Sequence, residues 1–328
     1  MFYELPKSIK LAHLPTPIEK LEKLSLLFEG PQIYIKRDDL TGMVLSGNKI
    51  RKLEFLLAEA LEQECDLLIT CGNYQSNHAR TTAVAAAKLR LKCHLVLRNT
   101  MGGTINGNLF LNRLLGAEIK YITPEEYLSV DEIMAELANE LKSKGHRPYI
   151  IPEGGSNEMG ALGYLKAVDE IAEQLKSMKL QIHHIVTAVG SGGTYAGLLL
   201  GKFLFDLSAE IHGINICDDE SFFVNKIHGI LKKAQKRFNL EVNLSKKDIK
   251  IIDGYVGKGY GLSSQEEIDM IKRVSLAEGI ILDPVYTGKA MVGLADKIRQ
   301  GKFKPEENIL FIHTGGIFGL FPKRTLFF

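Results

Sequence analysis

A lysine and two neighbouring cations stand at the start of a predicted helix. In the run LSGNKIRKLEFLL (residues 45–57), Lys49, Arg51 and Lys52 follow a Ser-Gly-Asn turn and lead an apolar-periodic segment. Three cations there are mildly unfavourable, because the helix dipole already puts partial positive charge at that end. A lysine in a cleft beside other positive charge, however, has a lowered pKa and can act as a nucleophile. Lys49 is therefore a candidate for covalent chemistry, and three solvated cations are the alternative.

A glycine-rich loop follows a predicted strand in TAVGSGGTYAG. The loop residues are Gly190, Ser191, Gly192, Gly193 and Thr194. Such a loop offers backbone N–H groups and a helix amino terminus to an anion. It lacks the Lys-Ser/Thr of a nucleotide P-loop and the glycine spacing with a following acidic residue of a dinucleotide site. A small phosphate ester fits better, and a tight strand-to-helix turn without a ligand is the alternative.

Four consecutive hydrogen-bonding side chains open another predicted helix, in ITCGNYQSNHAR. They are Gln75, Ser76, Asn77 and His78. One of Ser76 and Asn77 would cap the helix, which is the commonest use of these residues there. A carboxylate site would use the hydroxyl together with several free backbone N–H groups, so the run is also a candidate for substrate binding. His78 is a candidate only as part of the run, because a lone histidine there is more often structural.

Three further turns place tyrosines and threonines close to the ends of predicted strands. The motifs DPVYTG, IHTGG and GKGYG contain Tyr286 with Thr287, Thr314, and Tyr260, respectively. In open α/β sheets, ligands bind just beyond the carboxyl ends of the strands. A tyrosine at such a place is either packed in the core with a satisfied hydroxyl or a hydrogen-bond and proton donor in a cleft.

Several familiar catalytic arrangements are missing from these turns. The sequence shows no paired carboxylates, no metal-ligand cluster and no G-x-S-x-G nucleophile elbow. The acidic run Asp218–Asp219–Glu220 is interpreted as helix N-capping. What remains is a lysine nucleophile beside a phosphate site, a combination that points to pyridoxal phosphate. Lys49 would carry the cofactor aldehyde, while Arg51 or Lys52 would lower its pKa or help to hold the phosphate.

The elements that must position these residues alternate between short apolar runs and helical patterns. Ten runs, among them DLLITCG, HHIVTAVGSGG, GIILDPVY and NILFIHTGG, predict strands. The segments between them, such as residues 50–64, 161–178 and 288–301, carry apolar residues at the helical period. Strands spaced by helices imply parallel sheets, so the predicted fold class is α/β. Ten strands favour two sheets over one continuous sheet, and PEGGSN (residues 152–157) is the candidate crossing point.

Composition indicates an ordinary globular protein. The chain has 328 residues, of which 45% are hydrophobic and 24% charged, and its net charge is +2. This balance predicts no nucleic-acid partner and no membrane-surface partner, and the basic run KKAQKR (residues 232–237) is interpreted as a solvated helix face. Four cysteines without a CxxC pair are expected to be free thiols. Without a signal-peptide pattern or an apolar run of the roughly 20 residues that a membrane helix needs, the expected location is cytoplasmic.

Seven motifs, taken in order, resemble one family closely. They are YIKRDDLTGMVLSGNKIRKLEF, CGNYQSNHARTTAVAA, RPYIIPEGGSNEMGALGY, VGSGGTYAG, GKGYG, ILDPVYTGKAM and ILFIHTGG. The pattern is similar to that of the D-cysteine desulfhydrase and 1-aminocyclopropane-1-carboxylate (ACC) deaminase family. These are pyridoxal-phosphate enzymes of fold type II, the tryptophan-synthase-β-like group. The match runs from about Leu14 to Gly316, which is almost the whole chain.

The resemblance implies a domain arrangement and a cofactor site. Residues 1–49 and 157–328 would form a large cofactor domain, and residues 50–156 a smaller mobile domain that closes over a small amino-acid substrate. Each domain would be an open, mostly parallel twisted sheet flanked by helices, and family members are typically homodimers. Lys49 would bond the aldehyde of pyridoxal phosphate and later move the substrate α-proton. Lys52 and the glycine-rich loop would lie at the phosphate.

The resemblance also implies roles on the substrate side of the cofactor. Asn77 would hydrogen-bond the cofactor 3-hydroxyl, and Ser76 would hold the substrate carboxylate. Asn77 and His78 complete the predicted substrate-binding run. Tyr260 and Tyr286 would face the substrate.

Two positions separate activities within the family. Ring-opening deaminases are expected to carry VYEGK and HLGG, whereas this chain reads VYTGK and HTGG, with Thr287 and Thr314 together near the pyridine nitrogen. A carboxylate there would keep that nitrogen protonated and strengthen the electron sink, whereas a threonine hydroxyl is a weaker partner. β-Elimination from D-cysteine needs only α-proton removal and a good leaving group. The threonines therefore favour D-cysteine desulfhydrase activity, with pyruvate, hydrogen sulfide and ammonia as products.

Other activities stay open at this point. Ser46 and Tyr74 depart from residues common in bacterial members, and Tyr74 would narrow the pocket. The alternatives are an ACC deaminase, a lyase acting on another β-substituted amino acid, and a protein that binds pyridoxal phosphate without turnover. Lys49, Ser76 and Tyr286 argue against the last alternative, because a binder need not keep substrate-side groups.

Overall fold

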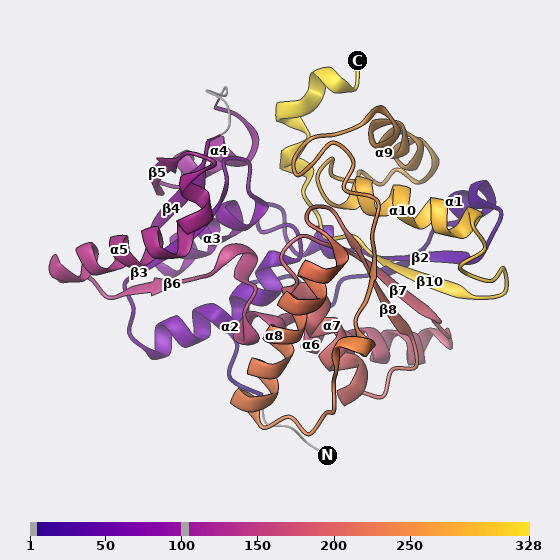
Figure 1. Cartoon of the computed structure of the whole chain (residues 1–328), viewed down its shortest axis with the longest axis horizontal. Coiled ribbons are helices and arrows are strands. Elements are labelled where there is room, and N and C mark those ends of the chain that lie inside the picture. Colours follow the sequence, from indigo (N-terminus) through magenta and orange to yellow (C-terminus); the bar gives the residue numbers. More distant parts are fainter. Residues whose placement is uncertain (1–4, 100–104) are drawn as a thin grey trace.

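Two sheets flanked by helices make up the protein, and the computed structural model describes residues 5–99 and 105–328 (Figure 1). The larger sheet has six strands in the order β1-β2-β10-β7-β8-β9. In that order they are β1 (Ile18–Lys20), β2 (Gln32–Lys36), β10 (Asn308–Ile312), β7 (His184–Val189), β8 (Glu210–Asn215) and β9 (Lys250–Ile252). Neighbouring strands are parallel except β1 and β2.

The smaller sheet has four parallel strands in the order β5-β4-β3-β6. They are β5 (Glu118–Ile122), β4 (Lys92–Arg98), β3 (Leu67–Asn73) and β6 (Pro148–Ile150). The fold class is α/β, as predicted, and the two sheets are separate rather than one continuous sheet.

Helices cover both faces of the larger sheet. The α-helices of the described residues are α1 (Glu22–Phe28), α2 (Lys49–Glu62), α3 (Asn77–Leu89), α4 (Gly107–Leu114), α5 (Val130–Ser143), α6 (Glu158–Met178), α7 (Gly193–Leu204), α8 (Glu220–Phe238), α9 (Gln265–Glu278) and α10 (Thr287–Arg299). Helices α1, α9 and α10 lie on one face and α6, α7 and α8 on the other (Figure 1). Strand β7 is buried on both faces. Ile185 and Val189 pack with α6–α8, whereas Val186 and Ala188 pack with α9 and α10.

Glycines let α2, α6 and α7 approach one another closely. A Cβ on Gly163 of α6 would lie 2.3 Å from the carbonyl oxygen of Arg51 on α2. A Cβ on Gly197 of α7 would lie 2.2 Å from the carbonyl oxygen of Ala161 on α6. Both distances are too short for any side chain, so the spacing of the three helices depends on glycine at these positions. Lys49 is the first residue of α2, and the glycine-rich loop leads into α7.

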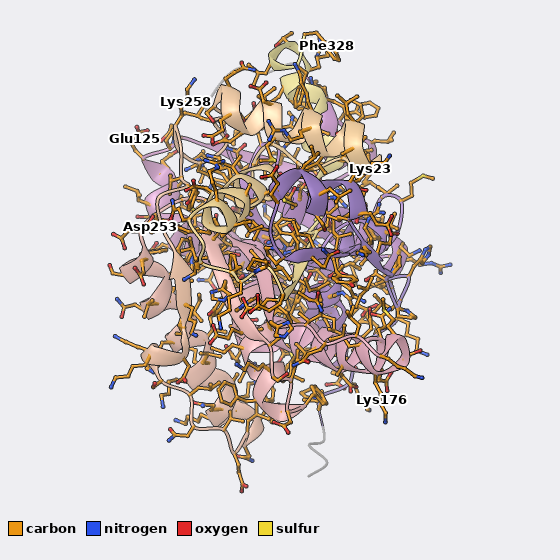
Figure 2. All side chains as sticks on the ribbon, turned by 90° about the vertical axis from the view of Figure 1, so that its right-hand side faces the viewer. Lys23, Glu125, Lys176, Asp253, Lys258 and Phe328 are labelled. Atoms are coloured by element: carbon orange, nitrogen blue, oxygen red, sulfur yellow. The ribbon has the colours of Figure 1, made fainter. Side chains whose placement is uncertain are left out.

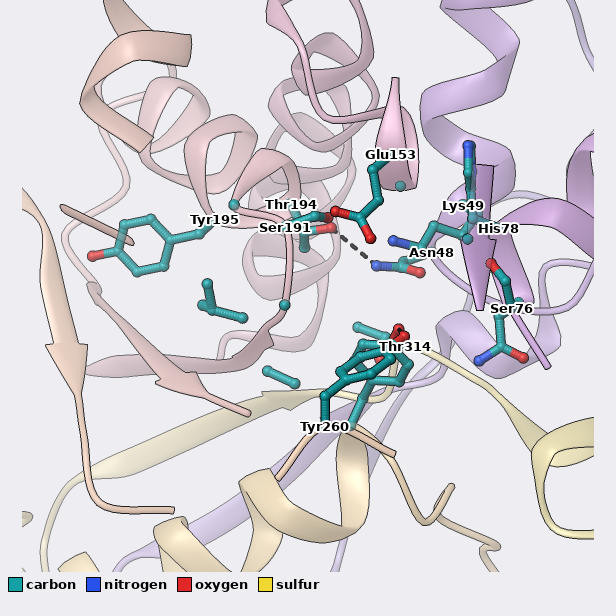
Figure 3. Close-up of a pocket in the computed structure, with 18 residues that line it drawn as sticks. Asn48, Lys49, Ser76, His78, Glu153, Ser191, Thr194, Tyr195, Tyr260 and Thr314 are labelled. Atoms are coloured by element: carbon teal, nitrogen blue, oxygen red, sulfur yellow. Dashed lines mark hydrogen bonds between the residues drawn. The ribbon is translucent and has the colours of Figure 1, made fainter. Parts of the chain in front are cut away.

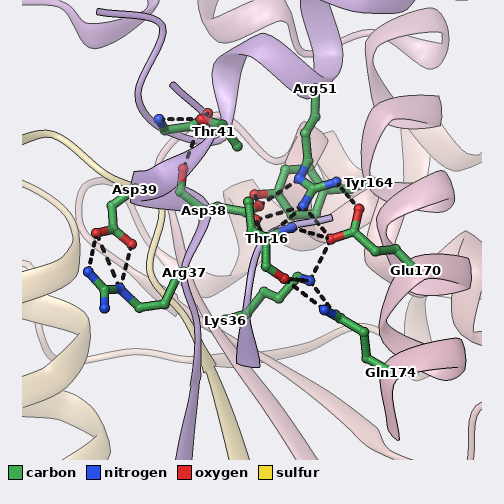
Figure 4. Close-up of polar contacts among 11 residues, drawn as sticks. Thr16, Lys36, Arg37, Asp38, Asp39, Thr41, Arg51, Tyr164, Glu170 and Gln174 are labelled. Atoms are coloured by element: carbon green, nitrogen blue, oxygen red, sulfur yellow. Dashed lines mark hydrogen bonds and ion pairs between the residues drawn. The ribbon is translucent and has the colours of Figure 1, made fainter. Parts of the chain in front are cut away.

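A buried ion network supports the start of α2 (Figure 4). The Arg51 guanidinium donates to Asp38 at 2.8 and 2.9 Å and to Glu170 at 2.9 and 3.0 Å. The Lys36 ammonium pairs with Glu170 at 2.5 Å. Burial alone would raise the pKa of Asp38, but the adjacent Arg51 holds it below its ordinary value. Arg51 is therefore a structural cation whose charge is balanced by two carboxylates.

One predicted strand is wrong. The run GIILDPVY (residues 279–286) has no strand, although Ile280 and Leu282 are buried. Asp283 folds the chain back, because its carboxylate accepts the backbone N–H groups of Val285 and Tyr286, and also that of Thr287 at the start of α10. An apolar run of this length predicts burial, and burial without strand pairing is the outcome here.

Charged side chains cover the surface, as at Lys23, Glu125 and Lys176 (Figure 2). Lysines of the basic run at residues 232–237 are exposed on α8, which confirms its interpretation as a solvated helix face. Asp219 caps α8 by accepting the N–H of Phe222, as predicted for the acidic run. All four cysteines are free. In the part of the chain that the structure describes, every helix is too short or too polar to cross a membrane.

Candidate active site

A pocket between the two sheets collects most of the predicted site residues (Figure 3). Its wall includes Lys49, Ser76, Asn77, His78, Gly190, Ser191, Gly192, Thr194, Tyr260, Tyr286 and Thr314. Three predicted residues are not in this wall: Lys52, Gly193 and Thr287. The pocket lies beyond the carboxyl ends of β3, β7 and β10, where ligands of open α/β sheets bind.

Lys49 is held against a backbone that leaves no room for side chains. A Cβ on Gly154 would lie 3.1 Å from the Lys49 amine and 2.5 Å from the Ser191 hydroxyl oxygen. Gly154 also has φ of 65°, in the left-handed region that favours glycine. Burial lowers the pKa of Lys49 to about 8, while Glu153 opposes the shift and Lys226 adds to it. Burial, rather than Arg51, is thus the main cause of the lowered pKa.

The glycine-rich loop ends at the amino terminus of α7, where Gly192 has φ of 86°. The Asn48 amide donates to the Thr194 hydroxyl at 3.0 Å and so connects this loop to the lysine run. The Ser156 hydroxyl oxygen accepts the N–H of Gly193 at 3.2 Å and lies 2.8 Å from the hydroxyl oxygen of Ser191. The loop therefore presents hydroxyls and a positive helix end at one side of the pocket.

Lys52 lies directly behind that loop. Its ammonium donates to the carbonyl oxygen of Gly154 at 3.1 Å and to the Ser156 hydroxyl at 3.0 Å. A Cβ on Gly193 would lie 2.9 Å from the Lys52 amine. Burial, followed by the charges of Lys49 and Lys226, lowers the Lys52 pKa well below its ordinary value. Among the described residues both of its hydrogen-bond acceptors are neutral, so the charge of the ammonium is left uncompensated.

The amino terminus of α3 forms the opposite wall. The Ser76 hydroxyl accepts the N–H of Ala79 at 3.1 Å, so Ser76 is the predicted helix cap. The Asn77 side-chain oxygen accepts from Asn108 at 2.9 Å. His78 is buried, and burial together with the charges of Lys49 and Lys52 lowers its pKa well below the ordinary value. A capped helix end, a hydroxyl and a neutral imidazole therefore meet at this wall.

His78 keeps a defined tautomer. The Thr70 hydroxyl donates to the carbonyl oxygen of Ile151 at 2.8 Å, so it accepts from His78 Nε2, which lies 2.9 Å away. The buried Nδ1 of His78 then carries the lone pair, and it has no hydrogen-bond partner in the part of the chain that the structure describes.

Two tyrosines face each other across the pocket. The hydroxyl oxygens of Tyr260 and Tyr286 are 2.6 Å apart, and the rings meet edge to face. The guanidinium of Arg98 lies over the Tyr260 ring, 5.6 Å from its centre. Burial raises the pKa of both tyrosines, so both hydroxyls keep their protons at neutral pH. The pair can therefore donate a hydrogen bond into the pocket.

The two threonines at the activity-separating positions have different surroundings. Thr314 lines the pocket, and its carbonyl oxygen accepts the N–H of Asn48 at 3.1 Å. The Thr287 hydroxyl donates to the Asp283 carboxylate at 2.8 Å and accepts the Asp283 N–H at 2.7 Å. Thr287 thus stabilises the turn before α10, and the structure does not bring its hydroxyl together with Thr314 in the pocket wall.

Residues 9–315 match the model of a family described as pyridoxal-phosphate dependent enzyme. The chain belongs to this family. Its fold is that of the fold type II, tryptophan-synthase-β-like pyridoxal-phosphate enzymes, and its cofactor is pyridoxal phosphate.

Relatives of this pyridoxal-phosphate enzyme carry two activities in their names. A bifunctional D-cysteine desulfhydrase/ACC deaminase of Arabidopsis thaliana, described as mitochondrial, is 44% identical over 96% of this chain and 80% of its own length. A putative ACC deaminase of Thermotoga maritima is 46% identical over 96% of this chain and 98% of its own length. A solved ACC deaminase homologue superimposes with a TM-score of 0.90 at 40% identity, covering 98% of this chain and 95% of its own.

The residues present fit pyridoxal phosphate. The uncompensated buried ammonium of Lys52, beside the amino terminus of α7, suits a phosphate group. The lowered pKa of Lys49 suits a lysine that must react as a neutral amine. The backbone at Gly154 and Gly193, where a Cβ would meet Lys49, Ser191 or Lys52, keeps that space free.

Sequence reasoning missed several groups of this pyridoxal-phosphate enzyme. Asn48 was seen only as part of a turn, and Glu153 and Ser156 only as part of the run PEGGSN between β6 and α6. Glu153 lines the pocket and accepts a hydrogen bond from the Tyr127 hydroxyl at 2.6 Å. The sequence signal that could have indicated Glu153 is its place beside two consecutive glycines, which often mark a close approach of the backbone to another group.

Proposed function

We propose that the protein catalyses pyridoxal-phosphate-dependent β-elimination from D-cysteine, giving pyruvate, hydrogen sulfide and ammonia. The relatives support the family and carry both D-cysteine desulfhydrase and ACC deaminase in their names. The observation that carries the choice is Thr314, which lines the pocket at the position where ring-opening deaminases are expected to have a leucine. Thr287 no longer supports the choice directly, because its hydroxyl bonds Asp283.

The bound cofactor supplies an electron sink for the electron pair left at Cα when the α-proton is removed. Lys49 takes that proton, and its pKa of about 8 gives it a useful fraction of neutral amine near neutral pH. The Cβ–S bond then breaks, and sulfide leaves with the electron pair. The released enamine takes up one water to give pyruvate and ammonia.

The chain's remaining roles concern binding. Lys52 and the loop from Gly190 to Thr194 would hold the phosphate, and Asn77 would hold the cofactor 3-hydroxyl. Thr314 would lie near the pyridine nitrogen. The buried ammonium of Lys52 and a helix amino terminus supply the positive charge that a phosphate requires.

On the substrate side, the Ser76 hydroxyl would donate a hydrogen bond to the substrate carboxylate, since its oxygen already accepts the N–H of Ala79. The hydroxyl pair of Tyr260 and Tyr286 would donate a hydrogen bond to the departing sulfide. His78, neutral and buried, would support this wall without changing charge at neutral pH.

Domain closure belongs to the same proposal. All four strands of the smaller sheet fall within residues 50–156, which supports a separate smaller domain there. Closure of that domain over the pocket would exclude water during elimination. The division at residues 49 and 157, the mobility and the homodimer stay predictions.

The decisive experiment incubates the holoenzyme separately with D-cysteine, L-cysteine and ACC, and measures pyruvate, α-ketobutyrate and sulfide. Pyruvate and sulfide from D-cysteine alone are expected, and Lys49→Ala is the inactive control. α-Ketobutyrate from ACC as the main product would support the second candidate, ACC deaminase, for which the relatives' names are the supporting observation. A bound cofactor without any product would support a binding protein or a lyase for another β-substituted amino acid.

A further inference from the structure

A second cluster of polar side chains lies at the opposite end of β7 and β8 from the pocket. His184 is the first residue of β7, and Glu210 is the first residue of β8. The two are register partners, and His212 lies two residues further along β8, on the same side of the sheet as Glu210. The register of two parallel strands thus brings together residues that are 26 and 28 positions apart in the sequence.

The spacing of the three side chains matches a tetrahedral metal site. His184 Nδ1 lies 3.2 Å from His212 Nε2, and His212 Nε2 lies 3.5 Å from a carboxylate oxygen of Glu210. All three ligand atoms lie within 4.8 Å of one another. Ligand atoms about 2.0–2.1 Å from one tetrahedral ion are about 3.4 Å apart, so the two short edges already have the required length.

A carboxylate and an aromatic ring fix the orientation of the histidines. His184 Nε2 lies 3.0 Å from a carboxylate oxygen of Glu307, which leaves Nδ1 with the lone pair. A carboxylate that accepts the far N–H of a histidine is the usual outer partner of a metal-binding imidazole. Phe303, which is buried, packs against both rings, with centre-to-centre distances of 4.9 Å to His184 and 5.5 Å to His212.

The two ring nitrogens of His212 have different surroundings. Its Nε2 lies in the cluster, 3.2 Å from His184 Nδ1. Among the described residues, His212 Nδ1 is buried without a hydrogen-bond partner. Moving the proton of His212 from Nε2 to Nδ1 therefore breaks only the hydrogen bond to His184, which a shared metal ion would replace.

We propose that His184, Glu210 and His212 bind one Zn²⁺ ion, with water as the fourth ligand. Two imidazole nitrogens and one carboxylate oxygen suit zinc better than magnesium or calcium, which prefer sets of oxygen ligands. Glu210 is half exposed, so the ion has access from solvent. The ion would cross-link β7 and β8 at their amino-terminal ends, opposite the pocket, and would have a structural role.

One neighbouring cation opposes binding and provides a test. The Lys250 ammonium pairs with the other carboxylate oxygen of Glu210 at 2.6 Å, and leaves the oxygen that faces His212 free. Lys250 is half exposed, so its replacement leaves the core undisturbed. Because a positive charge at this distance repels a divalent ion, the Lys250→Met variant is expected to bind Zn²⁺ more tightly than the unmodified protein.

The test titrates metal-stripped holoenzyme with Zn²⁺ by calorimetry and repeats the titration with Co²⁺ in the visible region. One tight equivalent is expected, with the intense ligand-field bands of a tetrahedral Co²⁺ site. His184→Gln and Glu210→Gln should abolish it, and Glu307→Gln should weaken it by about 10- to 100-fold. His94→Gln is the matched control, because His94 also faces a glutamate, Glu118 at 3.6 Å, but lies outside the cluster.

Each outcome decides the proposal. Loss of the equivalent in the two ligand variants, retention in His94→Gln and tighter binding in Lys250→Met would support it. Absence of any tight equivalent would overturn it and leave a hydrogen-bonded histidine pair. Survival of the equivalent in Glu210→Gln, a half-exposed change that keeps the fold, would also overturn it.

Discussion

Three cations, Lys49, Arg51 and Lys52, lie within four consecutive residues of the sequence. They differ in how their charge is balanced. Arg51 pairs with Asp38 and Glu170, and the shared network includes Lys36 (Figure 4). Among the described residues, Lys49 and Lys52 form no ion pair with a carboxylate within 4 Å, although Glu153 lies in the same pocket as Lys49 (Figure 3). Burial lowers the pKa of both lysines. Balanced buried charge holds a fold in place, whereas unbalanced buried charge is tolerated where a ligand will complete it.

The largest effect expected from this comparison is on activity. Lys49→Ala removes the group that moves the α-proton, so kcat on D-cysteine should fall by at least about 10³-fold. The free energy of unfolding of the apoenzyme should not fall, because burial already disfavours the Lys49 ammonium. The measurement is pyruvate release at saturating substrate, with the exposed Lys232→Ala as control. Residual activity within tenfold of the parent would show that another group moves the proton.

The opposite effect is expected at the balanced cation. Arg51→Met leaves the buried Asp38 carboxylate without its cation and Glu170 with Lys36 alone, and should lower the free energy of unfolding by about 3–5 kcal/mol. Lys144→Met, which breaks the exposed pair with Glu140, should cost less than about 0.5 kcal/mol. Denaturant unfolding of the two apoenzymes makes the comparison. Equal losses would mean that burial of the Arg51 network contributes nothing special.

Lys52 separates the two kinds of cation most sharply. Lys52→Met removes an uncompensated buried charge, so the apoenzyme should be as stable as the parent or more stable. Pyridoxal phosphate should nevertheless bind at least about tenfold more weakly, because a charge-assisted contact to the phosphate is lost. Cofactor titration followed by absorbance, together with apoenzyme unfolding, gives both quantities. A loss of stability with unchanged cofactor affinity would place Lys52 in the structural group.

A further effect is the pH dependence of apoenzyme stability. The pKa of Lys49 is about 8 in the folded chain against an ordinary 10.5. Between these values the unfolded chain binds more protons, so stability should rise with pH from about 8 to 10.5. This rise should weaken in Lys49→Met. The pKa values of Asp38 and Glu170 are lowered in the fold, so their contribution should be present above their ordinary values near 4 and be lost as pH falls. A flat alkaline limb would argue against the lowered lysine pKa.

Much of the candidate site could be predicted from the sequence, because strand-to-helix turns are local features. The loops at Gly190 and Ser76 and the lysine at residue 49 could be found from turn chemistry and helical periodicity alone. The two separate sheets followed from the number of apolar runs.

What could not be predicted depends on distant partners. In the sequence, Arg51 looks like its neighbours, and only the fold places Glu170, 119 positions away, beside it. The missed strand β1 has only three residues, too few for a period. The expected place of Thr287 near the pyridine nitrogen came from the family resemblance, but in the structure its hydroxyl donates a hydrogen bond to the nearby Asp283. A hydroxyl of this kind has several possible hydrogen-bond partners nearby, and its position in the sequence does not show which one it bonds.

The glycine contacts between α2, α6 and α7 have a consequence for tolerance. Pyridoxal phosphate joins its aldehyde to its phosphate through a rigid ring and a short methylene–oxygen arm, so the two ends of its site must stay a matched distance apart. Gly163 and Gly197 fix the spacing of the helices that lead from those two ends, since backbone meets backbone with no compressible side chain between. A single methyl group added at Gly163 would therefore push α2 away from α6 and move Lys49 relative to the phosphate end of the site.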